Sequence, residues 1–138
     1  MKDLKTELMV ICDYANVSRE GKLNINGIFD EIWVQSFPGG IARAFLVATI
    51  NGTPNTNYSL NLRVKNPTKG KNPIDNFALE TMTGANGKNN MIVELINLGF
   101  ENSGDYEVEL YQDKKVIGSK TLKVGEVGKK EEKFRIVN

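Results

Sequence analysis

The sequence YSLNLRVK, residues 58–65, alternates apolar and polar side chains without a break. Successive side chains of a β-strand point to opposite faces, so this period of two predicts a strand with one buried face. The same period returns in residues 91–95 and 106–111. No window carries an apolar stripe at helical spacing that is long enough for a helix. The pattern therefore predicts an all-β fold.

Turn-forming residues divide the chain into strand-length pieces. Gly, Pro and Asn cluster between the apolar runs, where they supply positive φ, fixed φ and side-chain-to-backbone turns. The eight expected strands are Glu7–Asn16, Lys22–Gln35, Ile41–Asn51, Asn57–Asn66, Asp75–Thr83, Asn90–Leu98, Asp105–Gln112 and Val116–Val124. Eight short strands at this spacing predict an antiparallel sandwich or barrel, and we favour a two-sheet sandwich.

The piece Lys22–Gln35 is too long for one regular strand. Leu23 and Ile25 alternate with asparagines, and Gly27 then interrupts the pattern. Because a glycine inside a strand often marks a bulge, we expect a bend at Gly27 that lets one strand serve both sheets.

The last hairpin has a register problem that a bulge solves. Pairing through a two-residue turn at residues 113–114 would leave Leu122 on the wrong face of the sheet. One extra residue at Gly118 restores the register and sets Tyr106 opposite Leu122, so we predict a bulge there.

The run LMVIC, residues 8–12, is apolar on both faces. In a two-layer sandwich one face of each strand meets solvent, so something outside the two layers must cover these side chains. If Leu8 and every second residue after it point into the core, Met9 and Ile11 need that cover. Either the segment 134–137 or a second subunit would supply it, and we favour a homodimer that associates through Met9 and Ile11.

Length and charge exclude several classes of protein. The chain of 138 residues suits one domain, which we place at residues 1–124, followed by a tail, residues 125–138, that forms at most a short edge strand. The net charge of +1 gives no basic surface for nucleic acid or for a membrane. No apolar run is long enough for a signal peptide or a membrane span.

The chain has no histidine and one cysteine, Cys12. This composition removes the commonest general base, the histidine-dependent nucleophiles and the multi-cysteine metal sites. We therefore expect no catalytic residue, no metal and no cofactor. A single thiol without disulfides favours a reducing cytoplasm over secretion.

The segment NSGDYEV, residues 102–108, resembles the tyrosine corner of immunoglobulin-like sandwiches. In that motif an acidic or amide residue, a glycine and a tyrosine alternate, and the tyrosine hydroxyl bonds back to the upstream backbone. Asn102, Gly104 and Tyr106 occupy those places, whereas Val108 stands where antibody domains carry a cysteine. The resemblance implies an immunoglobulin-like fold and a structural role for the three residues.

The N-terminal third carries a second resemblance. A hydrophobic strand ends in Cys-Asp-Tyr at residues 12–14 and precedes Gly-Lys-Leu at 21–23, Gly-Ile-Phe-Asp at 27–30 and Phe-Pro at 37–38. This order resembles the opening of a bacterial family of small soluble β-sandwich proteins of unknown function, and Gly-Asp-Tyr at 104–106 fits that family's C-terminal pattern. The resemblance implies the fold and a cytoplasmic bacterial setting, and it implies no activity.

Three aromatic residues form a candidate ligand site. Trp33, Phe37 and Phe45 would together present an aromatic surface to a sugar or a peptide, because ligand sites are lined mostly by apolar and aromatic side chains. The alternative interpretation places Trp33 in the core or in an interface, because it lies between Ile32 and Val34.

Carboxylates form a candidate metal site. If the first two strands make a hairpin, Asp13, Asp30 and Glu31 would gather near one end of the sandwich, and carboxylates on such loops can hold Ca²⁺. Acids at exposed strand ends are also ordinary, and no Asp-x-Asp spacing is present. The glycine-rich loop at residues 84–89 lacks the glycine and the Ser or Thr that a phosphate-binding loop requires.

Three functions stay open from the sequence. We favour a non-enzymatic, cytoplasmic sandwich that acts through protein contacts, first with its own copies. The alternatives are a module that binds carbohydrate or another small polar ligand through Trp33, and a hydrolase that uses carboxylates alone. A flat apolar patch over the first strand would favour the first function. A pocket lined by Trp33 and amides would favour the second, and two facing acids the third.

Overall fold

A computed structural model describes residues 3–128 of the chain, and these residues form nine β-strands and no helix. The strands are β1 (Lys5–Val17), β2 (Leu23–Phe29), β3 (Glu31–Val34), β4 (Gly39–Asn51), β5 (Asn57–Lys65), β6 (Ile74–Met82), β7 (Lys88–Phe100), β8 (Gly104–Gln112) and β9 (Lys115–Glu126). The predicted all-β class is confirmed, with one strand more than expected.

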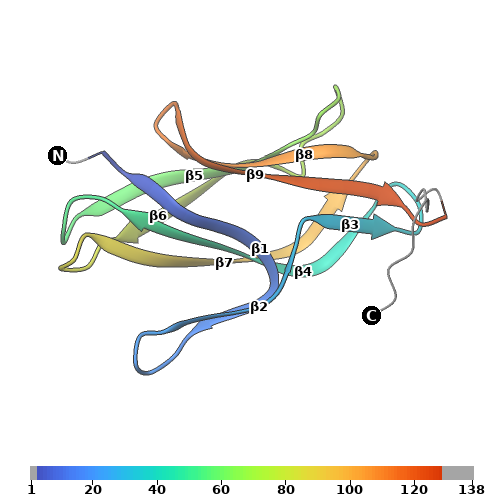
Figure 1. The fold of residues 1–138 in the computed structure, drawn as a ribbon. Coiled ribbons are helices and arrows are strands. Elements are labelled where there is room, and N and C mark those ends of the chain that lie inside the picture. Colours follow the sequence, from blue (N-terminus) through green and yellow to red (C-terminus); the bar gives the residue numbers. More distant parts are fainter. Residues whose placement is uncertain (1–2, 129–138) are drawn as a thin grey trace.

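The strands form two sheets that pack face to face. One sheet has the order β2-β1-β4-β7 and the other the order β3-β9-β8-β5-β6. Figure 1 shows them as layers, with β8 and β9 in the upper layer and β4 and β7 in the lower one. Neighbouring strands are antiparallel except β3 and β9, which are parallel. The predicted two-sheet, immunoglobulin-like sandwich is confirmed.

The alternation in β5 builds the core as expected. Tyr58, Leu60, Leu62 and Val64 are each no more than 3% exposed, while the residues between them face outward. Leu62 joins a cluster that includes Leu46 of β4, on the facing sheet. Burying one such side chain stabilises the fold by about 1.5–3 kcal/mol.

The piece Lys22–Gln35 serves both sheets, but the chain changes sheet later than predicted. The pairing of β2 with β1 keeps one register on both sides of Gly27, so no bulge lies there. The break comes at Asp30, after which β3 joins the other sheet beside β9. Gly27 has a φ of 69°, and a Cβ at this position would lie 2.3 Å from Oδ2 of Asp13. The glycine therefore makes room for the Asp13 side chain.

The predicted bulge in the last hairpin is present, one residue earlier than expected. Leu110 pairs with Gly118 and Tyr111 pairs with Val116, which leaves Ile117 as the extra residue. Beyond the bulge, Tyr106 pairs with Leu122 as predicted.

The predicted orientation of β1 was wrong. Ile11 is fully buried in the cluster between the two sheets, and Met9 packs against the same cluster. Val10 and Cys12 face the other way, toward the outer side of the β2-β1-β4-β7 sheet. A bulge between Thr6 and Leu8 shifts the register of β1 against β4. Met9 and Ile11 therefore do not form an exposed surface through which two copies could associate.

The outer side of β1 is covered by the protein's own hairpin. Figure 1 shows β1 bending sharply, so that its second half and β2 run back below the lower layer. A second apolar cluster lies under this hairpin. Its members are Val10, Cys12, Ala15, Phe45 and Val47, with Leu23, Ile25 and Ile92 packed against them. The cover expected from the tail or from a second subunit thus comes from β2.

The C-terminal strand runs past the expected end of the domain. β9 continues to Glu126, and the Val127 amide donates a hydrogen bond of 2.8 Å to the Val34 carbonyl. The tail strand expected at residues 134–137 lies outside the described residues. No helix within residues 3–128 is long and apolar enough to cross a membrane.

Candidate functional site

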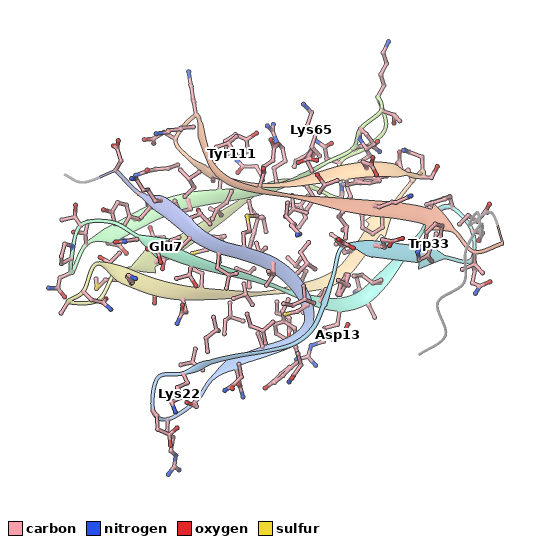
Figure 2. All side chains as sticks on the ribbon, viewed as in Figure 1. Glu7, Asp13, Lys22, Trp33, Lys65 and Tyr111 are labelled. Atoms are coloured by element: carbon pink, nitrogen blue, oxygen red, sulfur yellow. The ribbon has the colours of Figure 1, made fainter. Side chains whose placement is uncertain are left out.

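Trp33 lies at the end of the sandwich where β3 runs beside β9 (Figure 2). Its neighbours Ile32 and Val34 point into the core, being 4% and 5% exposed, so Trp33 points to the outer face. There the indole ring packs over Gly125, its partner on β9. A Cβ on Gly125 would lie 2.3 Å from Cζ3 of Trp33, so only glycine allows the ring to lie this close to the strand.

The Trp33 ring lines a pocket of about 530 Å³, within the usual size of a small-molecule site. The pocket lies between β9, the start of β8 and the segment that follows β3. Its lining is Trp33, Ser36, Phe37, Ser103, Gly104, Asp105, Lys123, Val124, Gly125 and Glu126. We call it the Trp33 pocket.

Four polar side chains of the Trp33 pocket are not used by the fold. Ser36, Ser103, Asp105 and Lys123 make no side-chain hydrogen bond or ion pair in the structure of residues 3–128. Asp105 and Lys123 lie directly opposite each other in the pairing of β8 with β9. The pocket therefore combines an aromatic surface with a carboxylate, an ammonium group and hydroxyls that can bond to a ligand.

Phe45 does not belong to the predicted aromatic site. It lies on β4 in the cluster under the β1–β2 hairpin and is 6% exposed. The Tyr14 ring meets it edge-on at 5.4 Å, and the Arg43 guanidinium lies 4.9 Å from its ring centre. The structure thus brings Trp33 and Phe37 together and places Phe45 on the opposite sheet.

Tyr106 makes the bond that defines a tyrosine corner. Its side chain is fully buried, and its hydroxyl donates a hydrogen bond of 2.7 Å to the carbonyl of Asn102. Burial raises the pKa of this hydroxyl above its ordinary value. Gly104 sits against Pro67, whose Cγ would lie 2.6 Å from an added Cβ. These contacts fix the turn that carries Ser103 and Asp105 into the Trp33 pocket.

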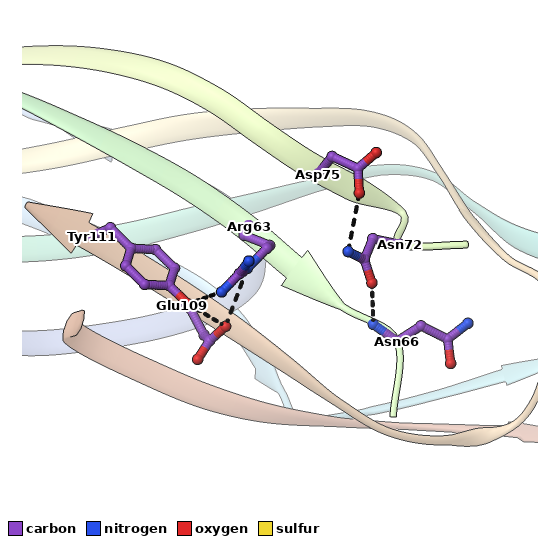
Figure 3. Close-up of polar contacts among 6 residues, drawn as sticks. All are labelled: Arg63, Asn66, Asn72, Asp75, Glu109 and Tyr111. Atoms are coloured by element: carbon purple, nitrogen blue, oxygen red, sulfur yellow. Dashed lines mark hydrogen bonds and ion pairs between the residues drawn. The ribbon is translucent and has the colours of Figure 1, made fainter. Parts of the chain in front are cut away.

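A second polar cluster, which the sequence analysis did not identify, lies on the same sheet where β5 pairs with β8 (Figure 3). Nε of Arg63 lies 3.4 Å from Oε1 of Glu109, and the Tyr111 hydroxyl donates to the same oxygen at 2.9 Å. The guanidinium also donates to the Tyr111 hydroxyl and lies 4.8 Å from the ring centre. These groups bond to one another, so fewer of them are available to a ligand than in the Trp33 pocket.

The candidate calcium ligands do not form a metal site. Asp13 lies against Gly27 at the bend of β1, whereas Asp30 and Glu31 line a small hollow with Thr121 and Lys123. Within residues 3–128 no three Asp, Glu, Cys or His side chains are placed to hold a metal ion.

Cys12 is fully buried under the β1–β2 hairpin, and it is unpaired. Burial raises the pKa of its thiol, so the reactive thiolate is scarce at neutral pH. This cysteine acts as a small apolar side chain.

Two solved structures with TM-scores above 0.5 support the fold. A β-glucosidase from Erythrobacter marinus is 8% identical with a TM-score of 0.58, over 89% of this chain and 15% of that one. A GH3 β-glucosidase from Bifidobacterium adolescentis is 10% identical with a TM-score of 0.53, over 89% and 17%. An immunoglobulin-like protein from Pseudomonas aeruginosa is 16% identical with a TM-score of 0.48, over 88% and 96%. The chain thus spans less than a fifth of either glucosidase, and the likeness concerns the fold.

Comparison with curated proteins gave no match. Comparison with family models gave one over most of the chain, residues 7–125, which is described as a family of unknown function (DUF6941). The family resemblance noted in the N-terminal third is therefore confirmed, and the chain belongs to the DUF6941 family.

Proposed function

We propose that this protein is a non-enzymatic binding module that holds a saccharide in the Trp33 pocket. One observation carries the proposal: the chain's only tryptophan lines a pocket whose serine, aspartate and lysine side chains make no hydrogen bond or ion pair within residues 3–128. The unpaired, buried Cys12 supports a reducing compartment such as the bacterial cytoplasm as its setting.

The chemistry of the pocket suits a polyhydroxylated ligand. The C–H face of a sugar ring is apolar and packs on an indole or phenyl ring, as Trp33 and Phe37 offer. Sugar hydroxyls both donate and accept hydrogen bonds, so Asp105 can accept from them and Lys123 can donate to them. Hydrogen bonds to charged groups contribute about 1.5–3 kcal/mol each, which is enough for specific binding.

The two rival functions have weaker support. Protein contacts through β1 were inferred from Met9 and Ile11, and both side chains pack against the inter-sheet core. The carboxylate-only hydrolase stays a second candidate because Asp105 and Glu126 line the same pocket. A hydrolase would release shorter products from the saccharide, whereas a binding module leaves it intact.

Fluorescence of the only tryptophan tests the proposal. We expect neutral saccharides of glucose, galactose, xylose or N-acetylglucosamine to change the Trp33 emission in a saturable way. If none of them does so up to about 10 mM, above the range of useful affinities, the proposed function is wrong. Chromatography of the saccharide after incubation separates binding from hydrolysis.

Two variants locate the binding. Lys123→Met and Asp105→Asn keep the tryptophan and each remove one charged group, so each is expected to weaken binding at least about tenfold. Lys22→Met is the matched control, because Lys22 lies at the tip of the β1–β2 hairpin (Figure 2). Equal affinity in all four proteins would contradict the assignment of the site.

A further inference from the structure

A second pocket adjoins the Trp33 pocket. It has a volume of about 470 Å³ and lies at the same end of the sandwich. Its lining is Pro38, Gly39, Lys71, Asn72, Pro73, Asn97, Gly99, Phe100 and Glu101. We call it the Lys71 pocket, and nothing in the proposed function uses it.

Two stretches of backbone join the walls of the two pockets. Phe37 lines the Trp33 pocket and the next residue, Pro38, lines the Lys71 pocket. On the other side, Ser103 lines the first pocket and Glu101 lines the second. Because Phe37 and Pro38 are consecutive and Glu101 and Ser103 are only two residues apart, these walls meet within about 8 Å on both sides. The two pockets are therefore close neighbours that share two walls.

The Lys71 pocket offers the same kinds of group as its neighbour. Pro38 and Pro73 supply apolar rings, while the side chains of Lys71 and Asn97 make no hydrogen bond within the described part of the chain. An ammonium group and an amide can donate to sugar hydroxyls, and the amide oxygen can also accept.

The loop that carries Lys71 is held in place by asparagines. The Asn66 amide donates to the Asn72 side chain at 2.8 Å, and Nδ2 of Asn72 donates to Asp75 at 3.0 Å (Figure 3). The Lys71 amide donates to Oε2 of Glu101 at 3.0 Å. A site whose walls are already ordered loses little conformational entropy when a ligand binds.

We propose that the two pockets are adjacent subsites of one groove, and that the ligand is an oligosaccharide rather than a single sugar. One unit lies on Trp33, and the next lies between the two proline rings and contacts Lys71. This inference rests on the proposed function, because it needs the Trp33 subsite.

A length series tests the inference. The probes are glucose, cellobiose and cellotetraose, with N-acetylglucosamine, chitobiose and chitotetraose as a second series, each titrated against Trp33 fluorescence. In one of the two series we expect the tetrasaccharide to bind at least about tenfold more tightly than the monosaccharide, because it fills the second subsite.

Three variants locate the gain. Lys71→Met is expected to remove most of the gain in affinity from monosaccharide to tetrasaccharide. It is expected to leave monosaccharide binding unchanged. Lys69→Met is the matched control, because Lys69 lies in the same loop but does not line the pocket. Glu31→Gln probes the hollow on the other side of Lys123, and it is expected to change nothing.

The outcomes separate the two proposals. Monosaccharide and tetrasaccharide of equal affinity would contradict the oligosaccharide groove and leave the Trp33 pocket intact. The oligosaccharide groove would also be contradicted if the gain in affinity with ligand length persisted in Lys71→Met and disappeared in Glu31→Gln. If neither series binds, the oligosaccharide inference is wrong. If the other saccharides of the fluorescence test do not bind either, the proposed function is also wrong.

Discussion

Single glycines decide where the functional side chains can lie. Gly125 is the clearest case, because the ring of Trp33 occupies the space that a Cβ would need. The position of the indole, and with it the floor of the Trp33 pocket, therefore depends on one missing methyl group.

Gly125→Ala is expected to displace the indole. The emission maximum of Trp33 should shift to longer wavelength as the ring leaves the strand, and saccharide binding should weaken. Fluorescence and circular dichroism of the same sample check both the shift and the fold. Gly84→Ala is the matched control, because an added Cβ there meets only ordinary contacts at 3.5 Å and Gly84 lines neither pocket. An unchanged emission in Gly125→Ala would contradict the packing of Trp33 on Gly125.

Tyr106 links the core to the turn at the pocket. We expect Tyr106→Phe to lower the free energy of unfolding by about 1–2 kcal/mol, since it leaves the partly buried Asn102 carbonyl without its partner. Urea denaturation measures this loss. Tyr14→Phe, whose hydroxyl lies on an exposed side chain, should cost less than about 0.5 kcal/mol. Equal losses in the two variants would mean that the corner bond does not stabilise the fold.

The contribution of Tyr106 should depend on pH. Burial raises the pKa of its hydroxyl, so above about pH 10 the unfolded state loses this proton before the folded state does. The stabilisation is therefore complete below that pH and is lost as the pH rises. Urea unfolding at about pH 8 and pH 11 should show a smaller gap between wild type and Tyr106→Phe at the higher pH. A gap that grows instead would contradict the direction of the shift.

The β1–β2 hairpin makes this protein differ from a simple two-layer sandwich, because it adds a cover on the outer face of one sheet. It curls over the outer face of its own sheet and buries a second apolar cluster beneath it. Sheet faces covered in this way need no partner protein, which is why the apolar run at residues 8–12 no longer argues for a dimer.

Removing two side chains from the underside of the hairpin should open this cluster. Leu23→Ser with Ile25→Ser is expected to lower the free energy of unfolding by about 1–2 kcal/mol for each side chain. It should also expose Cys12, the only cysteine, to a thiol reagent under native conditions. Val17→Ser, which changes a half-exposed residue of the same hairpin, should leave Cys12 unreactive. Equal reactivity in wild type and the double variant would show that the hairpin does not cover the thiol.

The sequence predicts the strands better than their surroundings. In residues 58–65 the polar side chains identify the face that meets solvent, so the apolar side chains identify the buried face. Residues 8–12 contain no polar side chain, so nothing in the run tells which face meets the core, and the predicted orientation was wrong. The cover by Leu23 and Ile25 depends on how the hairpin bends in space, which alternation does not report.

The pocket was predictable in part. Trp33 and Phe37 are close in sequence and were expected together, whereas Phe45 was placed with them only because it is aromatic. Lys123 and Asp105 were missed, although the predicted pairing of Tyr106 with Leu122 already sets Asp105 opposite Lys123. That register is the signal that could have identified them.

At the scale of the whole described structure, residues 3–128, one outer face is covered and one end of the sandwich carries two pockets. The β1–β2 hairpin covers much of one outer face, while two adjoining pockets lie where β3, the start of β8 and the end of β9 meet the loops after β3 and β5. These pockets are lined by Lys71, Asn97, Asp105 and Lys123, whose side chains make no hydrogen bond or ion pair within residues 3–128. A binding module of this design presents its ligand site on loops held by a rigid sandwich.

Chemical-shift mapping of the saccharide complex by NMR tests the central claim most directly. The single tryptophan gives one indole N–H signal, which reports on the Trp33 pocket by itself. We predict that a binding saccharide shifts this signal together with the amides of Phe37, Ser103 and Lys123, and leaves the amides of the β1–β2 hairpin unchanged. An indole signal that stays in place while other amides shift would contradict a ligand site at Trp33.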